Sequence, residues 1–389
     1  MQREFRLLML PTALGLLLAT LPGKAQYVQR NLVSDQPGVA VTTDPSLVNA
    51  WGLSAAPGGP FWVSDNGTGL STLYNGSGVK QGLVVTIVPT AGAPVAPVTG
   101  QVNNAVATDF GGANFIFVTE DGGVNAWKGG AGGTGTTAIL KVDNSAAGAV
   151  YKGLALANDG ASNHLYAANF HSGQIDVFNN NFAPVSLGGG AFTDPNLPAG
   201  YAPFNVQNVG GKIYVTYALT DGAGHDDVAG VGHGIVDVYS PSGALLQRLA
   251  TGSAAGGTLT TLNSPWGIAL APANFGHFSN DLLIGNFGDG TIDAFDPTSG
   301  LFQGQMTDAN GNLITIDGLW GLQFGNGGNN GLTNQLFFTA GPGDESHGLF
   351  GVLAATPEPS TWATAVIGAC SLAGFARRRR KRSGRVVSK

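Results

Sequence analysis

A strand unit that recurs six times along the chain is the feature that most restricts its fold. Each copy has an apolar strand, a loop, a second strand ending in a polar residue, a glycine-bearing turn and a third strand. One position of the first strand recurs at spacings of 53, 48, 52, 62 and 54 residues, at Leu53, Val106, Leu154, Val206, Ile268 and Leu322. Such periods match four-stranded blades with loops of varying length. The sequence therefore predicts an all-β fold, a six-bladed β-propeller.

Composition and the ends of the repeat favour a closed ring. Charged residues make up 11% of the chain, hydrophobic residues 43%, and 62 residues are glycine. This balance suits short strands joined by tight turns better than it suits disorder. The last copy lacks an outer strand after Val352, whereas residues 27–33 precede the first copy. We expect this segment to supply the missing strand, so the propeller is predicted to span residues 26–355.

Three segments of the repeat region resemble known propellers. Tyr-Ala-Ala-Asn at 166–169, followed by Gly-Gln-Ile-Asp-Val-Phe at 173–178, resembles NHL-type propellers. Asn-Leu-Val-Ser-Asp at 31–35 and His-Asp-Asp-Val-Ala-Gly at 225–230 are similar to motifs of an uncharacterised bacterial propeller family that often carries PEP-CTERM sorting tails. That resemblance implies the fold and brings no established activity.

The first 25 residues have the pattern of a secretory signal peptide. Arg3 and Arg6 give a positive start, residues 7–20 are apolar, and Gly23 and Ala25 are small residues at the positions that signal peptidase recognises. We expect cleavage after Ala25 on the general secretion route, because this segment has no adjacent arginine pair. A buried first helix is the alternative.

Residues 356–389 have a three-part pattern of their own. A proline-rich motif is followed by an apolar stretch at 362–376 and then by six consecutive basic residues at 377–382. As a helix the apolar stretch would span roughly 24 Å, short of a ~30 Å hydrocarbon core, and flanking arginines would compensate. The basic end would stay cytoplasmic. The motif residues are Pro357, Glu358, Pro359 and Ser360.

This tail resembles the PEP-CTERM sorting signal of Gram-negative bacteria. The resemblance implies a short transmembrane helix, transient anchoring in the inner membrane, processing by an exosortase-type enzyme, and an association with exopolysaccharide and biofilm export. A basic arm that binds nucleic acid is the alternative, but the apolar stretch has no role in such an arm.

The region between the two ends is strongly acidic. Residues 26–356 contain seven Lys and Arg against 22 Asp and Glu, which gives a net charge of −15. An acidic body repels phosphate backbones, so the sequence predicts no nucleic-acid binding. The single cysteine, Cys370, lies in the tail, so the body folds without disulfides.

Propeller topology gathers the loops between second and third strands on one face, together with the connections between blades. Asn66, Asn169 and Asn286 are assigned to equivalent positions in three blades. Hard oxygen ligands of this kind suit calcium, the one candidate cofactor. Asp and Asn are also good turn residues, so ordinary turns are the alternative. The candidate rim residues are Asp65, Asn66, Glu120, Asp121, Asn169 and Asn286.

The longest of these loops, residues 220–234, is rich in metal-ligand side chains. Two histidines and several carboxylates could form a transition-metal site, and a self-packed surface loop is the alternative. The candidate metal ligands are His225, Asp226, Asp227 and His233.

Three tryptophans, Trp51, Trp266 and Trp320, each precede a glycine at the start of an inner strand. They could stack on sugar rings at the channel mouth or pack between blades. Asp176, Asp237 and Asp293 recur within third strands. Repetition in several blades favours structural hydrogen bonding for these acids.

Two functional hypotheses follow. The first is an exported, non-catalytic binding or structural protein of the cell envelope or extracellular matrix, which contacts exopolysaccharide through its polar rim. The second is a calcium-dependent, lactonase-like hydrolase with its site at the channel mouth. Propellers of the second kind hold a cation with carboxylate and Asn ligands, which here would be Glu120, Asn169 and Asn286.

Overall fold

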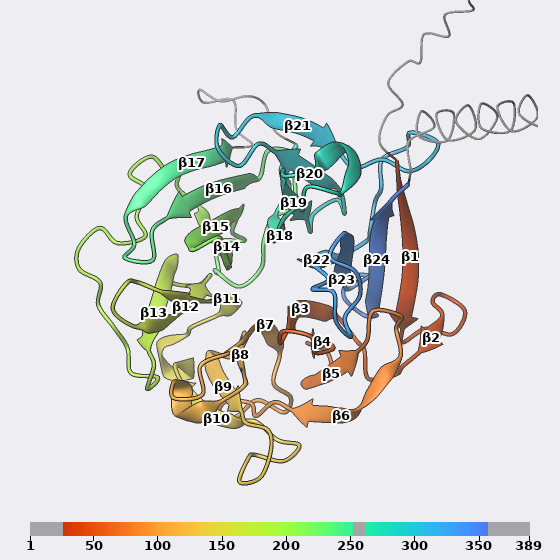
Figure 1. Cartoon of the computed structure of the whole chain (residues 1–389). Helices are drawn as coiled ribbons and strands as arrows, with labels where there is room; N and C mark the ends of the chain where they lie inside the picture. Colours follow the sequence, from red (N-terminus) through yellow and green to blue (C-terminus); the bar gives the residue numbers. More distant parts are fainter. Residues whose placement is uncertain (1–25, 252–260, 357–389) are drawn as a thin grey trace, which may run out of the picture. The chain divides into compact units, whose positions relative to one another are not determined.

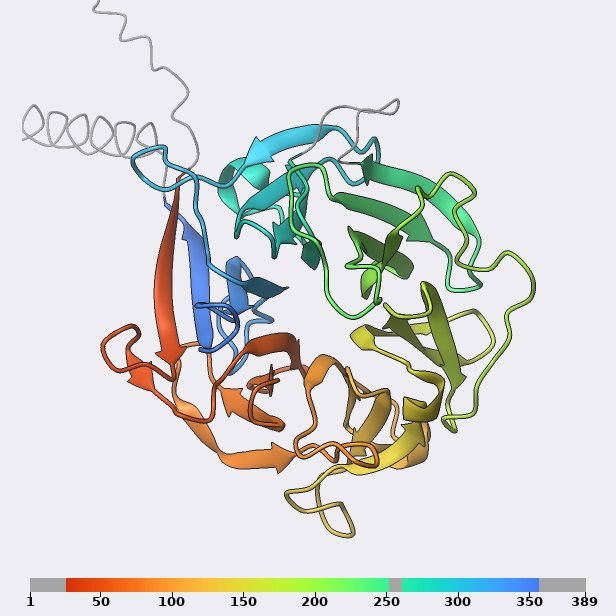
Figure 2. The same ribbon diagram turned by 180° about the vertical axis from the view of Figure 1, so that it is seen from behind.

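The computed structural model describes residues 26–251 and 261–356. Six sheets stand radially around a central axis, each with one edge at the centre (Figures 1 and 2). The prediction of an all-β, six-bladed propeller is therefore confirmed.

Blades 1 to 3 follow one another along the first half of the chain. Blade 1 comprises β3 (Ala50–Ala55), β4 (Phe61–Asp65), β5 (Leu70–Tyr74) and β6 (Lys80–Thr86). Blade 2 comprises β7 (Val98–Asn103), β8 (Phe115–Thr119), β9 (Gly123–Trp127) and β10 (Ile139–Asp143). Blade 3 comprises β11 (Tyr151–Asn158), β12 (Asn163–Asn169) and β13 (Gln174–Asn179).

Blades 4 to 6 complete the ring. Blade 4 comprises β14 (Tyr201–Val209), β15 (Lys212–Leu219), β16 (Gly234–Tyr239) and β17 (Leu245–Thr251). Blade 5 comprises β18 (Pro265–Leu270), β19 (Leu282–Asn286), β20 (Ile292–Phe295) and β21 (Phe302–Gln305). Blade 6 comprises β22 (Leu319–Phe324), β23 (Gln335–Ala340), β24 (Leu349–Ala355), β1 (Tyr27–Ser34) and β2 (Thr42–Thr43). Three short 3-10 turns are η1 (Phe110–Gly112), η2 (Ser145–Ala147) and η3 (Gly276–Phe278).

The ring closes by pairing the first strand of the propeller with the last. Strand β1 runs antiparallel to β24, from Tyr27 opposite Ala355 to Ser34 opposite Leu349. The buried Tyr27 hydroxyl also donates to the carbonyl of Phe275 in blade 5, at 3.0 Å. The predicted closure by residues 27–33 is thus confirmed.

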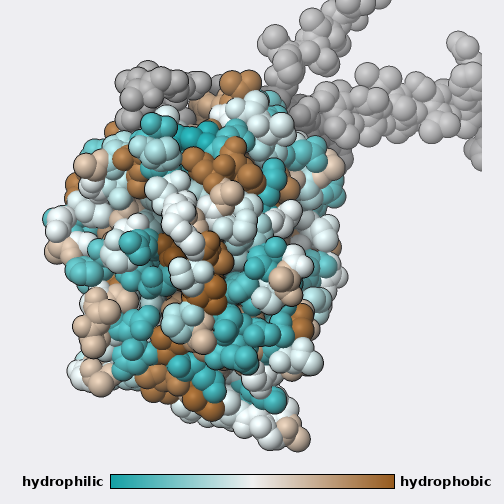
Figure 3. Space-filling model, turned by 90° about the vertical axis from the view of Figure 1, so that its left-hand side faces the viewer, coloured by the Kyte–Doolittle hydropathy of each residue, from teal (hydrophilic) through white to brown (hydrophobic). Residues whose placement is uncertain are grey.

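Burial along the strands explains why these sequences form blades. In the middle strands β4, β8 and β19 every residue is buried, because both faces of each blade pack on neighbouring blades. The outer strand β10 instead alternates between exposed and half-buried residues. Over the side wall, hydrophobic patches are separated by hydrophilic residues (Figure 3).

Two details of the predicted repeat are wrong. The inner strand of blade 2 is β7, whereas Val106 lies in a loop and is 41% exposed. The Asn104 side chain ends β7 by bonding both the amide and the carbonyl of Val106, each at 3.0 Å. Blade 3 has no fourth strand, and the segment after β13 pairs only briefly, through the amide of Val185 and the carbonyl of Val177.

The innermost strands approach one another closely. A Cβ on Gly100 would lie 2.4 Å from the backbone nitrogen of Leu154 in the next blade. Side chains join the same strands: Thr99 donates to the carbonyl of Tyr151 at 2.6 Å, and Gln101 donates to the carbonyl of Gly52 at 2.9 Å. These contacts fix the radius of the channel.

Both predicted targeting segments fall outside the part of the chain that the structure describes. The signal peptide at 1–25 and, apart from Thr356, the sorting tail with its helix at 362–376 stay predictions. Between residues 26 and 356, with 252–260 left aside, no helix has the length and apolarity needed to cross a membrane.

The inner-strand contact can be tested with Gly100→Ala. We expect it to lower the free energy of unfolding by about 2 kcal/mol or more, because the new methyl group would collide with backbone atoms. Gly82→Ala in β6 is the control, since a Cβ there would meet nothing within 4 Å. Denaturant unfolding of both variants measures the difference, and equal stabilities would contradict close packing of the inner strands.

Candidate functional site at the channel mouth

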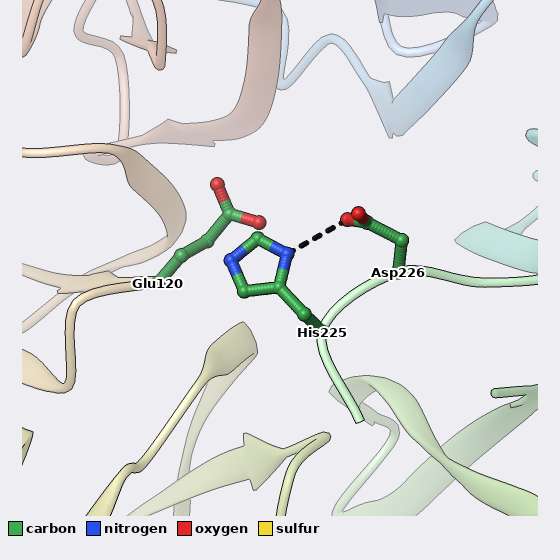
Figure 4. Close-up of side chains that lie close together, drawn as sticks. All are labelled: Glu120, His225 and Asp226. Atoms are coloured by element: carbon green, nitrogen blue, oxygen red, sulfur yellow. Dashed lines mark hydrogen bonds and ion pairs between the residues drawn. The ribbon is translucent and has the colours of Figure 1, made fainter. Parts of the chain in front are cut away.

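Loops from several blades converge at one end of the channel. Asn66 follows β4, Glu120 follows β8, and Lys152 lies at the start of β11. The long loop between β15 and β16 brings His225 and Asp226 from blade 4 to the same place (Figure 4). We call these five residues the mouth cluster.

Glu120 is held from two sides. Its Oε2 accepts a hydrogen bond from Nδ2 of Asn66 at 2.9 Å, and its Oε1 forms an ion pair with Nζ of Lys152. The Lys152 side chain is only 3% exposed, and its Nζ also lies 3.7 Å from Oδ1 of Asp226. A buried ammonium group requires such carboxylate partners.

Glu120, His225 and Asp226 place their ligand atoms within 4.8 Å of one another. Nδ1 of His225 lies 2.9 Å from Oδ1 of Asp226. Because a carboxylate only accepts hydrogen bonds, Nδ1 donates this one, and a metal held by both side chains would replace its proton. The imidazole lies between the two carboxylates in Figure 4.

The loop that carries His225 is held in shape by Asp221. Oδ1 of Asp221 accepts hydrogen bonds from the amides of Ala223 and Gly224, both at 2.9 Å. Across the blade boundary, Nδ1 of His171 lies 3.1 Å from the carbonyl oxygen of Ala223. Asp221 therefore stabilises a turn, a role in which Asp is common. The turn positions His225 and Asp226 at the mouth.

An aromatic cluster closes the channel beneath the mouth. Trp51 and Trp320 stack with their ring centroids 3.6 Å apart, and Trp266 meets both rings edge-on. Phe204 of blade 4 also contacts Trp320. Trp51 and Trp266 come from blades that are not neighbours, as do Phe204 and Trp320, so the cluster crosses the central axis. The ammonium of Lys152 lies over the Trp51 ring, 5.2 Å from its centroid.

The burial of the three tryptophans removes their faces from the mouth. Trp51, Trp266 and Trp320 are 1%, 5% and 1% exposed. Of the two roles that the sequence allowed, the three tryptophans therefore have the packing role. Their ring faces are not exposed at the mouth, where a sugar could stack on them.

Glu345, from the loop between β23 and β24, lies near the cluster. It accepts a hydrogen bond from Nδ2 of Asn49 at 3.0 Å, and Asn49 also donates to Asn66. Burial, followed by the negative charge of Glu120, raises the pKa of Glu345 to about 7, while Lys152 acts in the opposite direction. The mouth therefore holds a carboxyl group that titrates near neutral pH.

Two predicted rim residues face away from the mouth cluster. Asn169 donates to Asp176 at 3.0 Å, and Asn286 donates to Asp293 at 3.0 Å, in each case within its own blade. Their register was also misassigned. They lie at the ends of β12 and β19, the position that Asp65 holds in β4, whereas Asn66 is one residue further on.

Asp65 and Asp121 also lie apart from the mouth cluster. Asp65 is fully buried, and burial raises its pKa well above the usual value. The carboxylate of Asp121 instead accepts the amide of Thr90 at 2.8 Å, which joins two blades.

Of the candidate metal ligands in the loop at 220–234, some lie at the mouth cluster and others do not. Nδ1 of His233 bonds the carbonyl of Val228 at 2.8 Å, within its own loop. Asp227 is half-buried, burial raises the pKa of its carboxyl, and it forms an isolated bridge with Thr220. Of the four predicted metal ligands, the structure brings His225 and Asp226 together with Glu120.

The oxygen-only calcium set of the hydrolase hypothesis does not assemble. The amide oxygen of Asn169 accepts hydrogen bonds from Val150 and Ser172, and that of Asn286 accepts one from Asn263. Neither oxygen joins Glu120. The set that does assemble contains an imidazole nitrogen, which suits a transition metal such as zinc better than calcium.

Sequence reasoning missed Lys152, Glu345 and Asn49. Lys152 carried a usable signal, because it precedes Gly153 where three other blades have Trp before glycine. The proximity of Glu345 to Glu120 depends on how blades 6 and 2 are brought together, which no local pattern reveals.

Comparison with known proteins places the chain among propellers. No protein-family model matches it. It is 30% identical over 336 residues to the uncharacterized protein R648 of Acanthamoeba polyphaga mimivirus, covering 82% of this chain and 78% of the relative. The chain belongs to the family of that mimivirus protein.

Solved structures support the fold alone. A protein of unknown function from Bacteroides thetaiotaomicron has a TM-score of 0.53 at 12% identity, over 86% of this chain and 77% of that one. A glucose dehydrogenase has a TM-score of 0.53 at 12% identity, over 85% of this chain and 100% of that one. These likenesses support the propeller fold and do not bear on the NHL-type resemblance or the sorting tail.

The raised pKa of Glu345 predicts a pH-dependent cost in stability. Glutamate in the unfolded chain has an ordinary pKa of 4.5, whereas the pKa of Glu345 in the folded protein is about 7. Stability is therefore lost as pH rises through this window. We expect the advantage of Glu345→Gln over the parent to grow by about 3 kcal/mol between pH 4.5 and about pH 8. Urea unfolding across pH tests this, with Asp344→Asn in the same loop as control, and a constant difference would be contrary to expectation.

Proposed function

We propose that this protein is an exported binding protein that holds a divalent transition-metal ion at its mouth cluster and, through that ion, an acidic polysaccharide. The observation that carries the proposal is the approach of Glu120, His225 and Asp226 to within 4.8 Å. Three ligands from two blades leave further coordination positions to solvent, because His225 and Asp226 are exposed.

Charge supports a cation at this place. The carboxylates of Glu120 and Asp226 face a single ammonium group, that of Lys152. Glu345 adds a further negative charge above about pH 7. Such an excess attracts a divalent ion, although Lys152 limits the attraction.

A metal bridge gives an acidic propeller a physical route to an acidic polymer. With seven basic and 22 acidic residues, the body repels polyanions directly. A bound divalent ion with open positions offers carboxylate or sulfate groups a local attraction that the protein surface lacks. Residues 1–25 would direct export and residues 356–389 would direct sorting to the cell envelope, which agrees with a polysaccharide or biofilm setting.

A second candidate, a metal-dependent hydrolase of lactonase type, is favoured by one specific observation. The bond to Asp226 uses Nδ1 of His225 and leaves Nε2 as the nitrogen that would act as a general base. This candidate predicts turnover of lactone substrates by the metal-loaded protein, with loss of turnover in Asp226→Asn. Metal binding without turnover favours the binding protein.

Calorimetric titration with zinc, and separately with calcium, tests the metal site. We expect one zinc ion per chain, weaker calcium binding, and at least about a tenfold loss of zinc affinity in His225→Ala. His233→Ala is the matched control, since this histidine bonds only its own loop. Equal zinc affinity in both variants would eliminate the site. Retention of the chain on a zinc-loaded polygalacturonate column, but not on a chelated one, then tests the bridge.

Lys152→Met is expected to raise the zinc affinity, whereas His225→Ala is expected to lower it. Removing the ammonium group beside Glu120 and Asp226 should strengthen zinc binding by at least about tenfold, because a positive charge is taken from the ion's surroundings. Lys152→Arg, which keeps the charge, should leave the affinity close to that of the parent. Calorimetry on variants with confirmed cooperative unfolding makes the comparison, and weaker binding in Lys152→Met would mean that the ion lies elsewhere.

A further inference from the structure

A second cavity lies at the end of the channel opposite the mouth. It has a volume of about 390 Å³ and is lined by the innermost strands of the blades. Ser54 and Gln323 of its lining follow Trp51 and Trp320 along their strands, so the aromatic cluster separates this cavity from the mouth. We call it the far cavity.

The far cavity differs chemically from the mouth. None of its lining residues is charged, although the body carries 22 acidic residues. Its polar side chains are mostly carboxamides, which both donate and accept hydrogen bonds. They are Gln101, Asn103, Asn205, Gln207, Asn208 and Gln323.

Two of these carboxamides have acceptor atoms without a partner. Oε1 of Gln101 and Oε1 of Gln323 are buried and accept no hydrogen bond from the described residues. Gln101 is 6% exposed, and its Nε2 already donates to Gly52 and Trp62. Because these two oxygens have almost no exposed surface, a ligand reaches them only when their side chains turn toward the cavity, where a hydrogen-bond donor would satisfy them.

The edges of the sheets add to this lining. The innermost strands β3, β7, β11, β14 and β22 each form the central edge of a sheet and contribute consecutive residues to the cavity. Edge strands present backbone amides and carbonyls that are not used within the sheet. An anion would meet unpartnered acceptors with no cation nearby, whereas a molecule rich in hydroxyl groups can both donate and accept.

We propose that the far cavity is a second ligand site, which takes a neutral sugar of one or two rings. Its volume falls in the range of small-molecule sites. Sugar hydroxyls would bond the carboxamides of the lining, and Gln101 and Gln323 would turn their Oε1 atoms toward them. Leu53, Leu154 and Leu322 of the lining add apolar surface for the faces of the sugar ring. This site is independent of the metal at the mouth.

Saturation-transfer NMR and calorimetry with glucose, maltose and cellobiose test the proposal on the full chain. We expect at least one of these sugars to bind with one site per chain, and galacturonate to bind at least about tenfold more weakly than that sugar. Gln323→Leu should weaken sugar binding at least about tenfold without loss of stability, because it removes an unpartnered buried acceptor.

Gln303→Leu is the control, since this exposed glutamine of β21 lies outside the cavity. Sugar affinity should also be unchanged in His225→Ala, which separates this site from the mouth. Absence of binding by all three sugars would mean that water alone fills the cavity. That result, an equal affinity in Gln323→Leu, or equally tight binding of galacturonate would each overturn the proposal.

Discussion

Closure of the ring is the constraint on which the rest of this structure depends. A single blade buries neither of its faces by itself, so each sheet needs a neighbour on both sides. The pairing of β1 with β24 supplies the last of these contacts, and the buried Tyr27 hydroxyl extends it to Phe275 in blade 5. Without this pairing, the loops of blades 2, 4 and 6 would not converge at one end of the channel.

Closure also explains why the channel has two chemically different ends. Large aromatic residues at the start of several inner strands meet across the axis and fill it. In blade 3 the same position holds Lys152, which places a positive charge among rings and carboxylates. Carboxylates gather around that charge at the mouth. Beyond the rings the lining holds backbone edges, carboxamides and aliphatic side chains without a charge, so one end is suited to ions and the other to neutral ligands.

The fold could be predicted from the sequence because the repeat is a local and periodic signal. The same signal failed where a side chain ended a strand early, as Asn104 does before Val106. The site could be predicted only in part. Glu120, His225 and Asp226 were each recognised, because they lie in loops on one face, but a loop's position does not fix the direction of its side chains. Asn169 and Asn286 thus turn toward Asp176 and Asp293, which periodicity alone did not reveal.

The most direct test of the proposed metal site is a crystal structure of the zinc-soaked protein, with anomalous diffraction measured on both sides of the zinc absorption edge. The account predicts one strong anomalous peak within bonding distance of Glu120, His225 and Asp226. A peak held by other residues, or no peak at the mouth in crystals that diffract well, would contradict it.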